Sequence, residues 1–397
     1  MPQSTTSRRH WLRTATLATA ALATAPGWTR TPRFTPTPGS YSGFREHLPS
    51  LEWEYQLQGR PPLKARLLAN ENPYGPGPAC REAVAASAHE GNRYQHEVAA
   101  ELKTMIAAYE GVPEDHIMLT PGSSDVLEKM AIVHFKNGGN VVTADPAYMS
   151  LIQVTMGMGG TWNKVKLAGD WSHDLPAMRR AINAETKLVY ICNPNNPTGT
   201  TTDNDELRRF CREVARPDLP VFVDEAYLEF LDDHQQKTMV PLINEGKNVI
   251  VARTFSKIHG MAGLRVGYAV ATPETLAKVY KITRGNMGLC RTSLEGAKAS
   301  LADTEFQEQS RQQTAAFREQ VYAGLEKLGL TYVPSVTSFV LFPLPQGIVG
   351  TEYISGMFDL GVGVRAFDVH GRDYCRVSVG TPEETAVFLD ALQKTIA

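Results

Sequence analysis

The middle of the chain, from about residue 115 to 270, alternates short apolar runs with longer amphipathic stretches. The apolar runs predict strands at Ile117–Leu119, Val141–Ala144, Leu188–Cys192, Val221–Asp224, Val249–Arg253 and Val266–Val270. The stretches between them predict helices at Asp125–Phe135, Pro146–Gly157, Leu175–Ile182 and Asp205–Ala215. Strands that alternate with helices form a mostly parallel sheet with helices on both faces. Such sheets bind ligands beyond the carboxyl ends of their strands.

The pattern changes after about residue 300. A long polar stretch predicts a helix at Glu305–Leu328, and a final helix is expected at Pro382–Ile396. Apolar segments between them predict strands near Ser338–Leu344, Gly363–Ala366 and Tyr374–Val379. This part of the chain is therefore expected to form a smaller α/β domain.

The first 45 residues contain arginines but no aspartate or glutamate. The pair Arg8-Arg9 precedes Trp11 and Leu12, and a weakly apolar stretch with small residues runs from Thr14 to Ala25. A charged start, a short apolar region and small residues before a cleavage point are typical of an export signal. The paired arginines resemble the twin-arginine signal of bacteria, which predicts a periplasmic or exported protein. A mitochondrial transit peptide and an unstructured tail on a cytoplasmic protein are the alternatives.

A Pro/Thr-rich stretch at residues 29–42 is typical of a tether. We therefore expect four segments along the chain. They are an export signal at 1–25, a linker and N-terminal arm at 26–65, a large domain at 66–295 and a small C-terminal domain at 296–397.

Composition narrows the class of protein. Of the 397 residues, 42% are hydrophobic and 21% are charged, which is ordinary for a soluble globular protein. The net charge of −2 gives no overall basicity that would favour nucleic acid. No apolar run is long enough to predict stable membrane insertion. The five cysteines are scattered without a CxxC pair, so we expect neither a disulfide framework nor a metal site.

Three motifs follow predicted strands. The sequence NPNNPTG occupies 193–199, DEAY occupies 224–227, and TFSK at 254–257 is followed by Gly260, Gly263 and Arg265. Each motif alone has an ordinary explanation as a turn, a helix cap or a solvent-exposed lysine. Because the carboxyl ends of parallel strands meet at one edge of the sheet, we expect the three motifs to lie together.

Together the motifs suggest a cofactor site. A lysine in a protected pocket can have a lowered pKa and attack a carbonyl as a free amine. An arginine and backbone N–H groups nearby suit a phosphate. An aspartate can keep a pyridine nitrogen protonated, which a pyridoxal phosphate ring needs in order to withdraw electrons.

The order of NPNNPTG, DEAYLEF and TFSK with GLRVGY resembles the fold-type I aminotransferases of class I/II. Within them it is most similar to the histidinol-phosphate aminotransferase branch, whose NENPxGP motif resembles ANENPYGP at 69–76. The resemblance covers about residues 66–395. It implies an aspartate aminotransferase-like fold, in which a large domain with a mostly parallel sheet binds pyridoxal 5'-phosphate, and it implies a homodimer.

The resemblance also implies roles at the cofactor ring. Lys257 would form the Schiff base and move a proton between the substrate α-carbon and the cofactor. Asp224 would pair with the ring nitrogen. Asn196 and Tyr227 would hydrogen-bond the ring oxygen, and Tyr148 would stack on the ring face.

Further roles concern the cofactor phosphate and the substrate. Tyr94 would reach the phosphate of the partner subunit across a dimer interface. Within one chain the phosphate would be held by Ser123, Ser124, Thr254, Ser256 and Arg265. The substrate would be bound by Arg376, Arg365 and Asn72.

Two neighbours of these motifs are given no catalytic role. His259 follows the lysine by two residues, and we expect it to lie in the pocket wall or directly behind the residues that touch the ligand. Glu225 should point away from Asp224, because adjacent residues on a strand face opposite sides of the sheet.

The leading hypothesis is an aminotransferase that moves an amino group to a 2-oxo acid such as 2-oxoglutarate by a ping-pong mechanism. The candidate donors are histidinol phosphate and free amino acids, among them aromatic and basic ones, because two features depart from the branch. The tyrosine element upstream of the fold is not clear, and Thr337-Ser338-Phe339 replaces a small-Asn-Phe motif. A decarboxylase, a C–S lyase or an amino-acid oxidase would use the same cofactor. A non-catalytic binding module is the alternative of another class.

Overall fold

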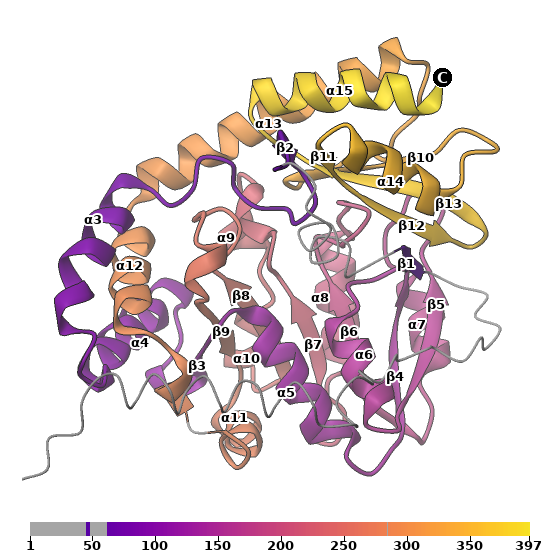
Figure 1. Ribbon diagram of the computed structural model, residues 1–397. Coiled ribbons are helices and arrows are strands. Elements are labelled where there is room, and N and C mark those ends of the chain that lie inside the picture. Colours follow the sequence, from indigo (N-terminus) through magenta and orange to yellow (C-terminus); the bar gives the residue numbers. More distant parts are fainter. Residues whose placement is uncertain (1–44, 48–61, 284) are drawn as a thin grey trace, which may run out of the picture. The chain divides into compact units, whose positions relative to one another are not determined.

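The computed structural model describes residues 45–47, 62–283 and 285–397, and these residues belong to one unit (Figure 1). The export signal predicted at 1–25, and most of the linker and arm predicted at 26–65, lie outside the described residues. Their predicted roles therefore stay predictions.

A seven-stranded sheet lies at the centre of this unit (Figure 1). The strands follow the order β3 (Ile117–Thr120), β9 (Gly267–Val270), β8 (Val249–Thr254), β7 (Val221–Asp224), β6 (Thr186–Cys192), β4 (Asn140–Asp145) and β5 (Thr161–Lys166). Only β9 runs antiparallel to its neighbours, and the other pairs are parallel. The prediction of a mostly parallel sheet is confirmed.

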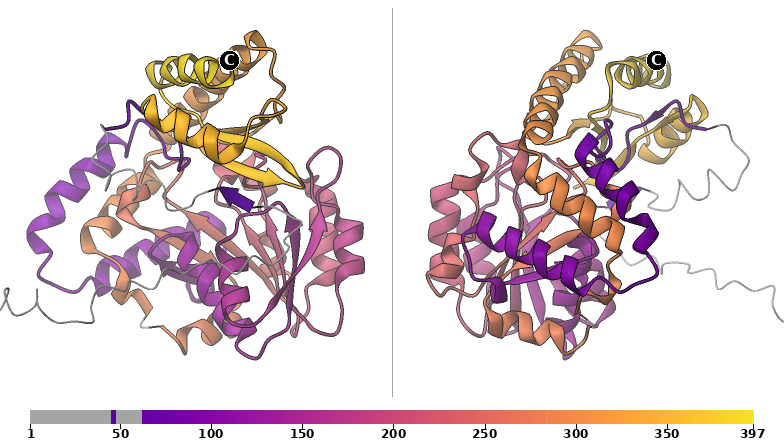
Figure 2. Two further views of the ribbon diagram at one scale, coloured as in Figure 1. Left: turned by 45° about the vertical axis from the view of Figure 1, so that its right-hand side comes forward. Right: turned by 90° about the vertical axis from the view of Figure 1, so that its left-hand side faces the viewer.

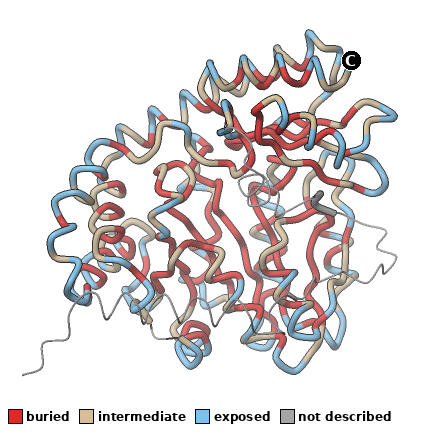
Figure 3. The backbone as a smooth tube through the Cα atoms, viewed as in Figure 1, coloured by how far each residue is buried: buried red, intermediate tan, exposed pale blue. Residues whose placement is uncertain are grey.

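Helices cover both faces of this sheet, which explains why its central strands are buried along their whole length (Figure 3). One face packs against α5 (Ser123–Phe135), α6 (Ser150–Gly157) and α11 (Pro273–Tyr280). The other face packs against α4 (His96–Glu110), α7 (Leu175–Ala181), α8 (Asn204–Val214), α10 (Pro241–Asn244) and α12 (Arg291–Ala302). Two further helices, α3 (Pro78–Ser87) and α9 (His234–Lys237), complete this part of the chain.

The C-terminal part builds a second, smaller core (gold and yellow in Figures 1 and 2). An antiparallel sheet has the order β1 (Arg45–His47), β12 (Arg365–Val369), β13 (Arg372–Ser378) and β10 (Phe339–Pro343). A parallel pair joins β11 (Val362–Gly363) to β2 (Ala65–Arg66). The helices are α13 (Thr304–Lys327), α14 (Gly350–Asp359) and α15 (Pro382–Ile396).

Side-chain caps explain where several helices begin. Asp174, Asp203 and Asp303 each accept a hydrogen bond from the backbone N–H three residues later, at the starts of α7, α8 and α13. Thr381 and Glu384 form a reciprocal capping box at the start of α15. Gly122 precedes α5 without a side-chain cap, so the first N–H groups of that helix remain available to a ligand.

Most predicted elements agree with the structure to within a few residues. The clearest difference is α6, which begins at Ser150 and not at Pro146. Residues 147–149 instead line a cavity. Among the described residues, no helix is both long enough and apolar enough to cross a lipid bilayer.

Candidate active site

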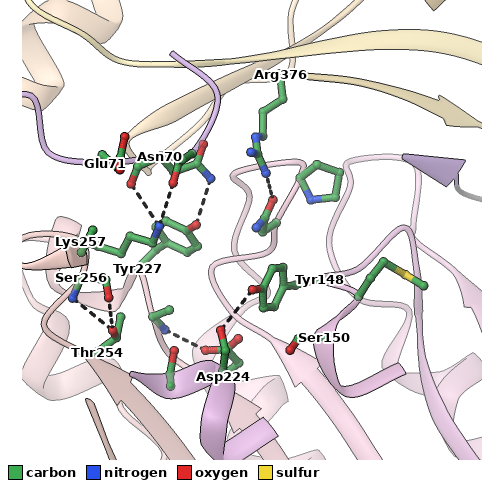
Figure 4. Close-up of a pocket in the computed structure, with 18 of the residues that line it drawn as sticks. Asn70, Glu71, Tyr148, Ser150, Asp224, Tyr227, Thr254, Ser256, Lys257 and Arg376 are labelled. Carbon is green, nitrogen blue, oxygen red and sulfur yellow. Dashed lines mark hydrogen bonds between the residues drawn. The ribbon is translucent and has the colours of Figure 1, made fainter. Parts of the chain in front are cut away.

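A cavity of about 580 Å³ lies beyond the carboxyl ends of β4, β6, β7 and β8, where the three motifs converge (Figure 4). The smaller sheet contributes its opposite wall through β12 and β13. Most of the residues predicted to form the site line this cavity. They are Ser123, Ser124, Tyr148, Asn196, Asp224, Tyr227, Thr254, Ser256, Lys257, Arg265, Arg365 and Arg376.

Lys257 follows β8 and extends into the cavity beside the segment that carries Asn70 (Figure 4). Its Nζ donates to the carbonyl oxygens of Ala69, at 3.0 Å, and Asn70, at 3.2 Å. Burial, together with the charge of Arg376, lowers the pKa of Lys257 to about 8, although Glu71 opposes this shift. A substantial fraction of this amine is therefore neutral, and hence nucleophilic, near neutral pH.

Asp224 ends β7 and is 2% exposed. Its Oδ1 accepts a hydrogen bond from the N–H of Ala226 at 3.2 Å. Its Oδ2 accepts one from the hydroxyl of Tyr190 at 3.4 Å. Burial raises the pKa of Asp224 to about 6, and these two hydrogen bonds oppose the rise. A cationic ring nitrogen in the cavity would be the natural partner of such a carboxylate.

Arg376 connects the smaller sheet to the loop after β6. Its Nη1 donates to Asn196 Oδ1 at 2.6 Å, and its Nη2 donates to the Leu68 carbonyl at 2.8 Å. Arg365 pairs opposite Arg376 in the β12–β13 ladder and donates from Nε to the same carbonyl at 2.9 Å. Two guanidinium groups thus lie side by side at one end of the cavity, which suits a carboxylate or phosphate.

Tyr227 lies between Lys257 and the smaller sheet. Its hydroxyl accepts a hydrogen bond from Asn70 Nδ2 at 2.9 Å, and its ring packs edge-on against Phe339. Burial raises the pKa of Tyr227, so the phenol remains a hydrogen-bond donor at neutral pH. The Nζ of Lys257 lies 5.5 Å from the centre of the Tyr227 ring.

The other end of the cavity combines hydroxyl groups with a cation. Ser123 and Ser124 begin α5, and Thr254 Oγ1 donates to Ser256 Oγ at 3.0 Å. Arg265 donates from Nη1 to Ser256 Oγ at 3.4 Å and to the Ala262 carbonyl at 2.9 Å. The free N–H groups at the start of a helix, an arginine and several hydroxyls together suit a phosphate dianion.

Two glycines allow this arrangement. A Cβ atom on Gly122 would lie 2.2 Å from Arg265 Nη2, and the φ of +88° at Gly122 is also unfavourable for other residues. A Cβ atom on Gly267 would lie 2.6 Å from the backbone carbon of Gly122 and 2.7 Å from the nitrogen of Ser123. Close approach of β9 to the start of α5 therefore requires glycine at position 267, and the positive φ favours glycine at position 122.

Tyr148 lies in the loop between β4 and α6, and its hydroxyl is 3.2 Å from Ser124 Oγ (Figure 4). Burial raises the pKa of this tyrosine, so its ring enters the cavity as a neutral aromatic group. That position allows it to cover the face of a planar ligand.

Two predicted site residues are not part of the cavity lining. Tyr94 is 73% exposed on the surface of the chain. Asn72 lines a smaller neighbouring cavity of about 290 Å³, and its Nδ2 donates to the Ile258 carbonyl and to Ser310 Oγ, both at 3.0 Å. In this structure Asn72 therefore connects the segment before α3 to the lysine loop and to α13.

The sequence analysis did not single out several residues that line the cavity. Asn70 adopts a φ of +53°, and its amide connects Tyr227 to Ser378, whose hydroxyl donates to Asn70 Oδ1 at 3.1 Å. Glu71 lines both cavities and forms an ion pair with Arg66 at 3.2 Å. Both residues stand beside Asn72 in the ANENPYGP motif, which was the available signal. The others are Ala69, Ala147, Met149, Ser150, Gln153, Pro197, Ala226, Ala262, Gly263 and Phe367.

Glu225 points away from the cavity, as predicted. It accepts hydrogen bonds from Thr238 and the Met239 N–H, and it forms an ion pair with the buried Arg253 at 2.9 Å. His259 is also buried outside the cavity, with Nδ1 3.0 Å from Ser300 Oγ. Among residues 62–283 and 285–397, no cluster of His, Cys, Asp and Glu is arranged to hold a metal ion.

The cavity residues fit pyridoxal phosphate. The glycines leave room for a phosphate at the start of α5, a buried carboxylate faces the cavity from β7, and a partly neutral lysine lies within it. These three features would serve, in that order, the phosphate, the ring nitrogen and the aldehyde of the cofactor.

Comparisons with known proteins agree with this arrangement. The family model for aminotransferase class I and II matches residues 64–392. A histidinol-phosphate aminotransferase of Symbiobacterium thermophilum is 37% identical over 332 residues, covering 83% of this chain and 90% of that protein. A histidinol-phosphate aminotransferase of Pseudomonas fluorescens is 36% identical, covering 86% and 91%.

Solved structures give the same result. The histidinol-phosphate aminotransferase of Sinorhizobium meliloti, in complex with pyridoxal-5'-phosphate, has a TM-score of 0.80 at 28% identity. The match covers 93% of this chain and 99% of that one. An aspartate aminotransferase of Thermus thermophilus shares the fold, with a TM-score of 0.73. The chain therefore belongs to the aminotransferase class I and II family and is a pyridoxal-phosphate-dependent aminotransferase.

Proposed function

We propose that this enzyme transfers the amino group of histidinol phosphate, or of a free amino acid, to a 2-oxo acid such as 2-oxoglutarate. The observation that carries the proposal is the pair of guanidinium groups, Arg365 and Arg376, at the end of the cavity beside Lys257. A phosphate or carboxylate bound there would direct the substrate's amino group toward the lysine. The names of the curated relatives support histidinol phosphate as the donor.

Each residue around the cofactor would bind a different part of it. Asp224 would pair with the ring nitrogen, and Tyr227 and the amide nitrogen of Asn196 would donate to the ring oxygen. Tyr148 would cover the ring face. The phosphate would be held by Ser123, Ser124, Thr254, Ser256 and Arg265. The bound cofactor withdraws electrons from the substrate α-carbon, which makes the proton on that carbon removable.

Lys257 would move this proton. A neutral amine is needed to accept it, and burial together with the charge of Arg376 favours the neutral form. The carbonyls of Ala69 and Asn70 would orient the amine through the hydrogen bonds already present. The same lysine would return the proton in the second half of a ping-pong cycle, when the 2-oxo acid occupies the site of the first product.

Assembly and location belong to the same proposal. We infer a homodimer in which Tyr94, exposed on one chain, reaches the cofactor phosphate of the partner. We also infer export in folded form through the twin-arginine signal at residues 8–12, with a cytoplasmic location as the alternative.

The test adds amino donors singly to purified holoenzyme without a 2-oxo acid and follows the absorbance of the cofactor. Histidinol phosphate should convert the cofactor to its amino form, since the two arginines can bind its phosphate. Histidine, aromatic amino acids, arginine, glutamate and threonine phosphate complete the panel. Conversion by free amino acids but not by histidinol phosphate would assign Arg376 to a carboxylate and reject histidinol phosphate as the donor.

Lys257→Ala is the control for the chemistry. It should remove the visible absorbance of the bound cofactor and lower turnover by several orders of magnitude, because no other cavity group replaces the amine. Normal turnover by this variant would contradict the assignment.

Asp224→Asn should bind cofactor yet lose orders of magnitude in rate, and a loss of only a few-fold would mean that another group supports the ring nitrogen.

A further inference from the structure

Tyr190 is a buried polar residue to which the proposed function gives no role. It lies on β6, is fully buried, and is among the largest fully buried side chains. In the β6–β7 ladder Tyr190 is opposite Phe222, and Cys192 is opposite Asp224. Alternate residues of a strand point to the same face, so Tyr190 and Asp224 lie on the same side of the sheet. They belong to cross-strand pairs that are two residues apart along the strands.

This geometry brings the tyrosine hydroxyl to the carboxylate. The ring of Tyr190 packs edge-on against Phe222, with centroids 5.9 Å apart, and this contact fixes its direction. Its hydroxyl donates to Asp224 Oδ2 at 3.4 Å, while the N–H of Ala226 donates to Oδ1. Of the side chains in residues 62–283 and 285–397, only that of Tyr190 donates to this carboxylate.

We propose that Tyr190 is a positioning residue that holds the Asp224 carboxylate, from the protein side, in the orientation that meets the cofactor ring nitrogen. The inference rests on the proposed role of Asp224. One donor on each oxygen fixes the carboxylate plane and leaves a lone pair for the ring. Both donors also stabilise the charged form, which burial alone disfavours.

The environment of Tyr190 keeps it a donor. Burial raises the pKa of its hydroxyl well above the usual value, and nearby Cys192 and Asp224 raise it further. The Cys192 thiol is likewise held neutral by burial and directs its S–H toward the Pro194 carbonyl at 3.5 Å. The Tyr190 hydroxyl therefore stays protonated and donates to Asp224 Oδ2, with the Cys192 sulfur as a second acceptor within its reach.

The test compares Tyr190→Phe with Tyr353→Phe. Phenylalanine keeps the ring and its contact with Phe222 and removes only the hydroxyl. Tyr353 is the matched control, because it is a buried tyrosine of α14, which packs on the smaller core, and its hydroxyl meets Cys375 Sγ at 3.5 Å. Two quantities are measured without substrate: the dissociation constant of pyridoxal phosphate, and the pH midpoint of the absorbance change of the bound cofactor.

Tyr190→Phe should raise the dissociation constant about fivefold, the equivalent of one hydrogen bond. Tyr190→Phe should also shift upward the pH midpoint of the absorbance change. A less firmly held carboxylate stabilises less positive charge on the cofactor ring, and a less positive ring releases its titrating proton only at higher pH. Tyr353→Phe should change neither quantity, although both variants should lower the melting temperature.

A double-mutant cycle separates positioning from packing. In the Asp224→Asn background, Tyr190→Phe should no longer change the dissociation constant, because the carboxylate it supports is gone. Equal effects in both backgrounds, or a Tyr190→Phe holoenzyme with the wild-type constant and midpoint, would overturn the inference. A failure of the proposed function can be told apart from a failure of this inference, because Lys257→Ala would then leave the absorbance of the bound cofactor unchanged.

Discussion

At the scale of single residues, the protonation of Lys257 depends on a few charges around it. Arg376 and Arg265 favour the neutral amine, whereas Glu71 and Asp224 favour the ammonium ion. The arginines therefore have two effects, since they suit an anionic substrate and also lower the pKa of the lysine. Glu71 opposes them from the ANENPYGP segment, where its own charge is paired with Arg66.

This balance predicts the pH dependence of cofactor loading. The neutral amine attacks the aldehyde, so reconstitution of apoenzyme with pyridoxal phosphate should accelerate with pH and level off above about pH 8. Glu71→Gln should move the midpoint to lower pH, because it removes a charge that raises the lysine pKa. Arg376→Gln should move the midpoint to higher pH. The rate of appearance of the cofactor absorbance, measured from pH 6 to 10, checks both directions.

Glu82→Gln, on the exposed surface of α3, is the control and should leave the midpoint unchanged. If Glu71→Gln left the midpoint in place or raised it, Glu71 would not be electrostatically coupled to Lys257.

The sequence predicted the residues that stand in motifs but not those that support them. Lys257, Asp224 and Arg265 follow strands at recognisable spacings, so their meeting could be expected. Tyr190 stands in none of the motifs, and the ANENPYGP motif contains Asn70 but does not show what Asn70 contacts. Their roles depend on the β6–β7 register and on a positive φ, and neither quantity is visible in a pattern of apolar positions.

At the scale of elements, the pattern of apolar positions predicted the strands that are buried on both faces and missed those that are not. Central strands such as Val221–Asp224 are continuous apolar runs because helices cover both faces. Strand β5, at Thr161–Lys166, is an edge strand with mostly exposed or half-buried residues, so it lacks that pattern and was not predicted. Helices α3, α4, α9, α10, α11, α12 and α14 were also not predicted.

Packing of β9 against the start of α5 gives a second prediction. Gly267→Ala would place a methyl group against the backbone of Gly122 and Ser123, and backbone cannot rotate away as a side chain can. The first turn of α5 should shift, and the dissociation constant of pyridoxal phosphate should rise at least about tenfold, or about 1.4 kcal/mol. Equilibrium titration of apoenzyme measures it.

Gly157→Ala is the matched control, because a Cβ atom there meets nothing within 4 Å. It should bind cofactor like the wild type. Wild-type affinity in Gly267→Ala would mean that the contact between β9 and α5 does not determine the phosphate end of the cavity.

At the scale of the whole molecule, the exposed apolar residues indicate which surface the proposed homodimer would use. Tyr94, Ile282 and Met287 are 73%, 50% and 40% exposed. Gln95 Nε2 donates to the carbonyls of Asn286 and Leu289, which holds the segment with Tyr94 against residues 285–289. An apolar surface that carries the tyrosine expected at the partner's phosphate is where the dimer should form.

Ile282→Glu combined with Met287→Glu should therefore yield monomers, detected by analytical ultracentrifugation. The cofactor should also bind more weakly, because Tyr94 would no longer reach the partner. Val349→Glu changes another exposed apolar residue, 48% exposed, at the start of α14, and should leave the mass unchanged. A double glutamate variant that remains dimeric would place the interface elsewhere.

The cavity walls also constrain the order of events during synthesis. Its side chains come from Ala69 to Arg376, and β13 supplies the last of them. The ribosome releases Lys257 long before the strand that carries Arg376, so a nascent chain holds the reactive amine before the site can close around it. A chain interrupted before β13 would lack the guanidinium that suppresses the lysine's charge, so its amine would capture the cofactor more slowly near neutral pH. Rapid acquisition of the cofactor near neutral pH consequently depends on completion of the smaller sheet.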